Sequence, residues 1–165
     1  QFNTGLEQDE LPVLQYTQDD ATFYGVEFNG GIRVAQFDQG EFWLTGMYDY
    51  IDAELDVDGN DNLPRTPPWR VGVGAQLTWG MFNANVDYLY ANEQDDVSDF
   101  ELPTDDYEDL RIYLGANVPN SFGDFELFLQ GKNLTDDEQR YHQSYIKDFA
   151  PQPGRTIECG LRLAF

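Results

Sequence analysis

One loop of the sequence carries side chains that could bind a metal ion. His142 is the only histidine of the chain, and it follows Asp136, Asp137 and Glu138 within a long polar segment. Imidazole nitrogens and carboxylate oxygens are ligands that suit Zn²⁺. We therefore predict ligand binding at these four residues, with His142 as the metal ligand. A histidine in a solvated surface loop is the alternative, because one nitrogen ligand without a second N or S ligand makes a poor site.

The sequence predicts no catalytic residues, and we expect neither an enzyme nor a bound cofactor. It has no G-x-S-x-G motif, no second histidine and no phosphate-binding glycine loop. Residues 56–61 place oxygens at alternating positions, as a calcium loop does. The EF-hand pattern needs Gly at its sixth position and Glu at its twelfth, where this chain has Asp61 and Pro67. We therefore expect a solvated acidic turn there.

Composition narrows the class of protein. The net charge of −22 argues against a nucleic-acid partner, because phosphates attract Lys and Arg. Aromatic residues make up 15% of the chain, and they are frequent in β-strands. The sequence contains no run of about 18 apolar residues, so it predicts no transmembrane helix. We therefore expect one all-β domain.

Apolar and polar residues alternate with a period of two along most of the chain. The clearest example is residues 69–79, where Val71, Val73 and Leu77 alternate with Arg70 and Gln76. This period is typical of strands with two unlike faces. It predicts seven strands, at residues 22–37, 41–55, 69–79, 82–91, 107–118, 124–134 and 155–165. Residues 5–20 read as a loop, in which residues 11–16 begin an extended arm.

The connections between the predicted strands alternate between short and long. Short turns lie at residues 38–40, 80–81 and 119–123, and long connections at 56–68, 92–106 and 135–154. The strands are 10 to 16 residues long, enough for a tilted crossing of a bilayer. Outer-membrane β-barrels have short periplasmic turns and long outer loops. Acidic residues also concentrate in the long connections, so we expect a negatively charged outer mouth.

The polar face of the predicted strands carries ionisable side chains such as Glu27, Arg33, Arg111 and Arg162. A dry core would not accept them, whereas a wide, water-filled or plugged lumen would. The sequence favours an antiparallel transmembrane barrel. Two alternatives stay open: a self-contained outer-membrane barrel of about eight strands with a structural or adhesive role, and a soluble β-sandwich that binds carbohydrate through Tyr and Trp.

Three ordered segments resemble the TonB-dependent outer-membrane receptor family. In chain order they are Asn62-Leu63-Pro64-Arg65-Thr66-Pro67-Pro68-Trp69-Arg70, then Gly131-Lys132-Asn133-Leu134-Thr135-Asp136-Asp137-Glu138 with the following Arg140-Tyr141-His142, and last Lys147-Asp148-Phe149-Ala150-Pro151-Gln152-Pro153-Gly154-Arg155 with the closing strand to Phe165. The stretch from Leu11 to Gly25 and the loop from His142 to Asp148 resemble the zinc-receptor branch.

The resemblance implies that residues 1–165 form the C-terminal seven to eight strands of a 22-stranded barrel, with no counterpart of the plug domain. It implies active uptake of a scarce nutrient, such as zinc or a metal–siderophore complex, through the outer membrane of a Gram-negative cell. The implied partners are the TonB complex acting through the plug, outer-membrane lipid and lipopolysaccharide, the barrel-assembly machinery, and a metal or metal-chelate substrate.

The final strand has a separate role in this interpretation. Leu161, Leu163 and Phe165 alternate with Arg162 and Ala164 up to the last residue. We expect the first three to face lipid. The resemblance implies that this strand closes the barrel and that Phe165 is the signal read during assembly. With two unpaired sheet edges, the chain by itself is expected not to fold stably.

Overall fold

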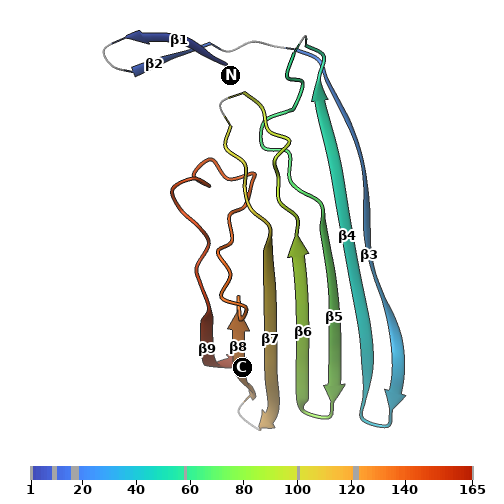
Figure 1. Ribbon diagram of the computed structural model, residues 1–165. Coiled ribbons are helices and arrows are strands. Elements are labelled where there is room, and N and C mark those ends of the chain that lie inside the picture. The colour runs from blue at the N-terminus through green and yellow to red at the C-terminus, as the bar shows by residue number, and fades with distance from the viewer. Residues whose placement is uncertain are drawn as a thin grey trace.

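The computed structural model describes residues 2–8, 11–15, 19–57, 59–99, 101–120 and 123–164. Within these residues the regular structure is entirely β-strand (Figure 1). The strands are β1 (Phe2–Gln8), β2 (Leu11–Gln15), β3 (Ala21–Phe37), β4 (Gly40–Leu55), β5 (Arg70–Trp79), β6 (Phe82–Ala91), β7 (Tyr107–Asn120), β8 (Gly123–Lys132) and β9 (Thr156–Ala164).

Strands β3 to β9 form one antiparallel sheet in which each strand pairs with its neighbour in sequence. The all-β fold and the seven predicted strands are therefore confirmed. Strand β3 has 17 residues and β4 has 16, so this hairpin rises above the others (Figure 1). The register of the hairpin shifts between Arg33 and Ala35, which is a β-bulge that leaves one extra residue on β3.

The N-terminal segment differs from the prediction. Residues 5–20 were expected to form a loop, but β1 and β2 pair as a separate two-stranded antiparallel sheet. The acidic composition concealed the hairpin, of which only residues 11–16 were expected to be extended. Strand β2 contains Pro12. A two-stranded ribbon gives each strand one open edge, which is where proline is tolerated.

The short turns lie at one end of the sheet and the long connections at the other (Figure 1). Phe37 pairs with Gly40, and Trp79 pairs with Phe82, so the turns occupy residues 38–39 and 80–81. Gly80 has a φ of 56°, a conformation that glycine adopts readily. The third turn is tighter than predicted, because Asn120 pairs directly with Gly123 and Pro119 belongs to β7. The sixth predicted strand is shorter, because β8 ends at Lys132 rather than Leu134.

One face of the sheet, called the outer face here, is apolar from strand to strand. Cross-strand pairing places Ile32, Leu44, Ala75, Val86 and Ile112 in a single row. Many of these side chains are exposed, with Ile32 at 66%. Aromatic rings lie near the two ends of the apolar band: the Phe37 and Trp79 centroids are 5.3 Å apart, and those of Trp69 and Tyr90 are 5.5 Å apart. An apolar band between aromatic girdles is the exterior of a membrane barrel.

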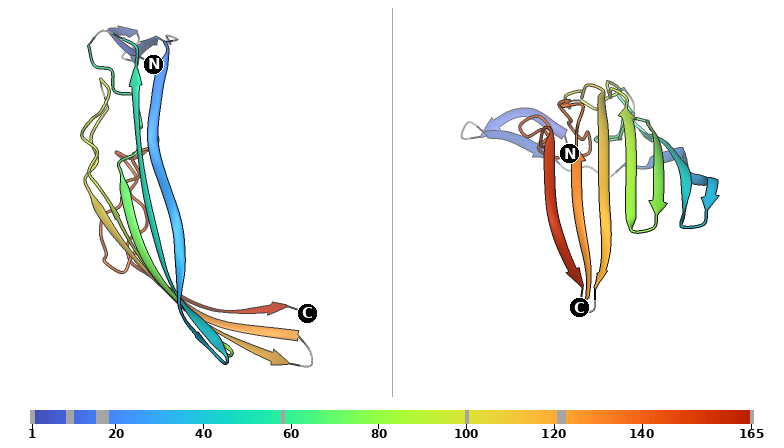
Figure 2. Two further views of the ribbon diagram at one scale, coloured as in Figure 1. Left: turned by 90° about the vertical axis from the view of Figure 1, so that its right-hand side faces the viewer. Right: turned by 90° about the horizontal axis from the view of Figure 1, so that it is seen from below.

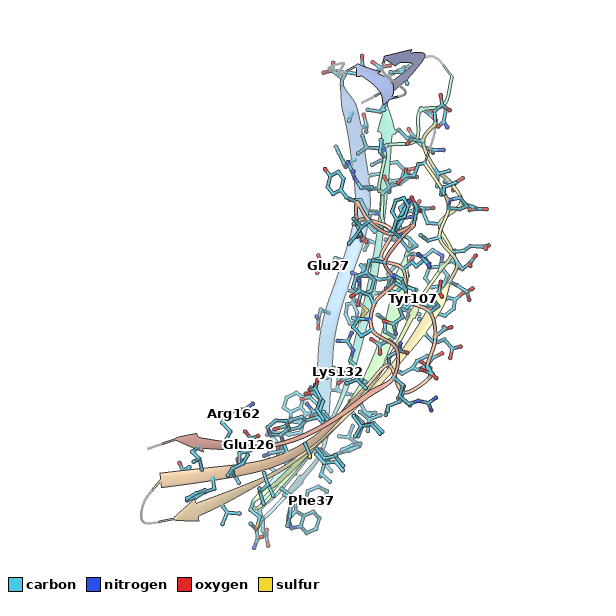
Figure 3. The ribbon with its side chains drawn as sticks, turned by 90° about the vertical axis from the view of Figure 1, so that its left-hand side faces the viewer. Glu27, Phe37, Tyr107, Glu126, Lys132 and Arg162 are labelled. Carbon is cyan, nitrogen blue, oxygen red and sulfur yellow. The ribbon has the colours of Figure 1, made fainter. Side chains whose placement is uncertain are left out.

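The opposite face, called the inner face here, carries paired charges and amides. Arg70 donates two hydrogen bonds to Asp49, at 3.0 and 2.9 Å, and Lys132 pairs with Glu158 at 3.1 Å. Arg162 pairs with Glu126, and Figure 3 shows both on the inside of the bend of the sheet, whereas Phe37 lies on the outside. The predicted division into an apolar and a polar face is therefore confirmed along the described strands, and contact of the apolar face with lipid stays a prediction.

The sheet is a single twisted and curved layer (Figure 2). In the sheet order β3 and β9 are the two edges, and no pairing joins them in the described part of the chain. Neither the second sheet of a sandwich nor the closure of a small barrel is seen within these residues. The described segments include no helix long and apolar enough to cross a membrane.

Candidate functional site: the outer loops and the inner groove

The four residues predicted to bind ligand lie in the long connection between β8 and β9, and each of them has partners within the protein. Asp136 accepts hydrogen bonds from the backbone N–H of Arg155 at 3.0 Å and from its guanidinium at 2.6 Å. Asp137 accepts from the backbone N–H of Glu108 at 2.8 Å, and Glu138 accepts from Arg140 at 2.8 Å. The first two carboxylates therefore tie this loop to the starts of β9 and β7.

His142 is buried, with 2% of its surface exposed, so it is not the solvated loop histidine of the alternative interpretation. Its Nδ1 lies 2.9 Å from Thr104 Oγ1, and its Nε2 lies 3.2 Å from Glu101 Oε1. The Lys147 ammonium is 3.2 Å from Nδ1 and 3.1 Å from Nε2. We assign a neutral ring whose Nε2–H donates to Glu101 and whose Nδ1 accepts from Thr104 or Lys147.

Glu101 is the centre of a cluster that joins three outer connections, and we call it the Glu101 clasp. Its carboxylate accepts from Lys147 Nζ at 3.0 Å and from the backbone N–H of Arg65 at 3.1 and 3.2 Å. Within its own loop it also accepts from Ser98 Oγ at 3.2 Å. Its side chain is 9% exposed and that of Lys147 is 5% exposed, so this ion pair is largely shielded from water. The clasp therefore links the β4–β5, β6–β7 and β8–β9 connections.

The surroundings of the clasp shift two pKa values. Burial, and then the neighbouring Lys147 ammonium, lower the pKa of His142 below its ordinary 6.5, against the opposing attraction of Glu101. Burial acts to raise the pKa of Glu101, but the hydrogen bonds from Lys147 and from the Arg65 backbone, with the Lys147 charge, lower it overall. The two shifts favour the carboxylate form of Glu101 and the neutral form of His142.

Asn133 is a second organising residue, and no pattern in the sequence predicted a structural role for it. Its side-chain amide donates to the carbonyl oxygens of Asp137 at 2.9 Å and Pro153 at 3.3 Å. Its Oδ1 accepts from the Asp137 N–H at 3.1 Å and from Thr135 Oγ1 at 3.1 Å. Its φ is 48°, a left-handed conformation that Asn tolerates better than most residues. The motif that contains Asn133 was noticed in the sequence, but only for its likeness to the family.

A groove of about 640 Å³ lies on the inner face below these loops. Its floor includes Gly72 and Gly74 of β5, and its walls include Arg70 and Arg111. Residues 141–143 of the last loop line it as well, so this loop reaches the inner face of the sheet. The Arg111 guanidinium pairs with the buried Asp109 carboxylate at 2.6 Å. The groove therefore combines guanidinium, carboxylate, amide and aromatic groups in a space far larger than a single ion.

The metal site at His142 stays a prediction. In the described part of the chain, no group of three or more His, Cys, Asp and Glu side chains is placed to hold a metal ion. His142 and the acidic run Asp136, Asp137 and Glu138 do not form such a group.

The residues assigned to barrel closure lie on β9. Leu161 pairs with Leu127 and Leu163 with Phe125, in outer-face rows, and they are 54% and 49% exposed. Phe165, to which the assembly signal was assigned, lies outside the described residues. The closure and assembly roles themselves stay predictions.

A comparison with protein families places these features in context. The family described as "TonB dependent receptor-like, beta-barrel" matches residues 2–134, which include β1 to β8. No curated protein matches the chain at a significant level. The family comprises outer-membrane receptors that transport nutrients rather than enzymes. Because the match covers most of the chain, the chain belongs to the TonB-dependent receptor-like β-barrel family.

Proposed function

We propose that the protein takes up a scarce nutrient across the outer membrane with energy delivered by TonB, and that this chain supplies barrel strands and outer loops. The observation that carries the proposal is the family match over residues 2–134. The apolar outer face and the polar inner face of the sheet support it, because a transport barrel needs lipid on one side and a hydrated lumen on the other.

The remaining barrel is part of the proposal. Strands β3 and β9 have one partner each among the described strands, and an open edge of this length needs a further strand. We propose that additional strands complete the 22-stranded barrel that the family resemblance implies. A plug domain would fill it and contact the TonB complex, while the outer-membrane lipids and lipopolysaccharide surround it. The assembly machinery would read the strand that ends at Phe165.

We further propose a metal ion, with zinc as the first candidate, or a metal chelate as the substrate. The acidity of the outer loops supports attraction of a cation: residues 92–106 contain seven acidic residues and no Lys or Arg. The choice of zinc rests on the resemblance of residues 11–25, and of the loop from His142 to Asp148, to the zinc-receptor branch.

Growth of a strain that lacks the intact receptor tests this proposal. We expect the deletion strain to grow poorly when a chelator limits zinc, and normal growth to return with the receptor gene supplied in trans. A variant lacking the TonB-contacting segment is the matched control and should not restore growth. If the deletion strain and the parent strain grow equally under zinc limitation, but the deletion strain grows poorly under iron limitation, the proposed substrate would be an iron chelate instead of zinc. Normal growth under both limitations would contradict metal uptake.

A further inference from the structure

The β8–β9 connection contains a segment that crosses the inner face, and we call residues 139–150 the strap. Its base is closed just beyond its second end, where the N–H of Gln152 donates to the carbonyl of Gln139 at 2.8 Å. Gln139 is 2% exposed, and its side-chain amide donates to the carbonyl of Glu108 at 3.2 Å. The strap is therefore a closed loop whose base is fixed against the start of β7.

The middle of the strap is held by side chains of a different kind. Lys147 and His142 point inward, with 4% and 2% exposure, and both contact Glu101 of the β6–β7 connection. The Arg140 guanidinium donates to the carbonyl of Lys147, which fixes the turn inside the strap. The Arg65 guanidinium lies over the Tyr145 ring, with Arg65 Cζ 3.7 Å from the ring centroid. The strap is thus attached to its neighbours mainly through polar and charged contacts.

Apolar packing contributes little to this attachment. Tyr145 is 82% exposed, Ile146 58% and Phe149 87%, so these three large side chains bury little apolar surface. A loop with few buried apolar contacts belongs to the low-stability end of a structure and opens locally. Its docked state then depends on the Glu101 clasp, and breaking one partner of a buried ion pair leaves an uncompensated buried charge.

The strap also lines the inner groove. Residues 141–143 contribute to the lining, and the Tyr141 ring lies 5.9 Å from the ring of Tyr107, at the start of β7. Leu89 and Met47 line the same groove from β6 and β4. Removing the strap would take away the wall that residues 141–143 provide and leave the walls provided by the sheet.

We propose that residues 139–150 are a hinged strap that the Glu101 carboxylate clamps against the inner groove, so that release of Glu101 opens the groove without unfolding the sheet. Glu101 is a positioning residue in this mechanism, because it acts on the groove through Lys147 and His142. The inference rests on the proposed function in one respect, since it treats the inner face as the transport lumen.

Hydrogen–deuterium exchange of the intact receptor in detergent tests the clamp. Glu101→Gln keeps the shape of the side chain and removes its charge, and we expect at least tenfold faster exchange of the amides of residues 139–150. The amides of β5 to β7 should exchange at the wild-type rate. Asp96→Asn is the matched control, because it removes one charge from an exposed carboxylate of the same β6–β7 connection, and it should leave the exchange of residues 139–150 at the wild-type rate.

Lys147→Gln separates the clamp from a general loss of stability. It should accelerate amide exchange in the strap as Glu101→Gln does. Exchange in the double variant should be no faster than in either single variant, because both substitutions remove the same ion pair. Unchanged strap exchange in Glu101→Gln would overturn the proposal. Acceleration spread equally over β5 to β7 would also overturn it, since the carboxylate would then stabilise the whole sheet rather than the strap.

A thiol probe tests whether the groove opens. In a Cys159→Ser background, a cysteine at Leu89 lies in the groove and one at Asn85 lies on the inner face outside it. A bulky maleimide should modify Leu89→Cys faster when Glu101→Gln is present, and Asn85→Cys at the same rate with or without it. Equal modification rates of Leu89→Cys with and without Glu101→Gln would overturn the proposal that release of Glu101 opens the groove. Neither readout depends on uptake, so failure of the strap and failure of the proposed transport are separate results.

Discussion

The sheet and the outer loops of this protein place opposite kinds of side chain in contact with their surroundings. On the outer face of the sheet, large apolar side chains are exposed, with Val73 at 62% and Phe82 at 58%. In the loops, the buried side chains include Gln139, His142 and Lys147. In the described residues, the buried apolar side chains are few, namely Ala53, Pro68, Ala91 and Tyr107.

This difference is the one expected of a chain that meets two solvents, lipid and water. The outer face is stable in hydrocarbon, because the backbone hydrogen bonds are made between strands and the apolar side chains meet lipid. The loops have no lipid and little apolar burial, so a few buried polar groups must be paired to hold them. The stability of the sheet therefore comes from many similar rows of cross-strand pairs. The stability of the loops depends on single residues such as Glu101 and Asn133.

The largest expected effect is a charge placed in the apolar band. Val86→Arg puts a guanidinium on the outer face near the middle of β6, and we expect a loss of about 2–4 kcal/mol in barrel stability. Asn85→Arg, one residue away on the inner face, should cost much less because the lumen is hydrated. Urea unfolding of the intact receptor in liposomes measures both. Equal losses would contradict the assignment of faces.

A smaller and local effect is expected at Asn133. Replacing it with Ala removes four side-chain hydrogen bonds around a buried site and places Ala at a φ of 48°. We expect a loss of about 1–3 kcal/mol in the stability of the last loop. The measurement is protease cleavage of that loop in the intact receptor, with the exposed Gln143→Ala as control. The same cleavage rate for both variants would mean that Asn133 does not organise the loop.

The strap should also respond to pH through His142. Its pKa is lowered in the folded loop, so the unfolded loop binds more protons between the lowered value and the ordinary 6.5. The contribution of His142 is therefore complete above about pH 6.5 and is lost as the pH falls below it. Glu101, whose pKa is also lowered, keeps its contribution until the pH falls below its ordinary 4.5.

Amide exchange of residues 139–150 between pH 7.5 and 5.5, corrected for the intrinsic rate, measures this effect. We expect reduced protection at pH 5.5. His142→Gln should remove the difference between the two pH values. The same pH dependence in wild type and His142→Gln would assign it to other groups.

The smallest effect is expected at an exposed ion pair. Glu138 and Arg140 are 2.8 Å apart, with 66% of the Glu138 side chain exposed. Glu138→Ala should change loop stability by less than about 0.5 kcal/mol, because water screens such pairs. The cleavage assay used for Asn133 provides the comparison. A loss as large as that of Asn133→Ala would contradict the view that burial decides which loop contacts matter.

The strands were predictable because their period-two pattern is a consequence of the two faces. Residues 82–91 form β6 as predicted, and β5 starts within one residue of its predicted boundary. The hairpin of β1 and β2 was missed, because residues 5–20 have the polar and acidic composition of a loop. The two strands form through their pairing with each other, which the composition does not indicate. The extension of β7 through Pro119 was missed because proline usually ends a strand.

The loop contacts were less predictable. The acidic run and His142 are close in sequence, which suggested one site, but His142 contacts Glu101, 41 positions earlier in the chain. No local pattern distinguishes Glu101 from the six other acidic residues of residues 92–106. Burial separates them, and burial here depends on how three loops meet. Long-range pairing of this kind leaves no period in the sequence.

The most direct test of this account is the location of the two ends of the sheet relative to the outer membrane. Single cysteines at Asp96 and Tyr145, in long loops, and at Gln39, in a short turn, can be introduced into a Cys159→Ser receptor. A bulky, membrane-impermeant maleimide should label the first two on intact cells and Gln39→Cys only after the outer membrane is permeabilised. Labelling of Gln39→Cys on intact cells, or protection of both loop positions, would contradict an outer-membrane barrel in this orientation.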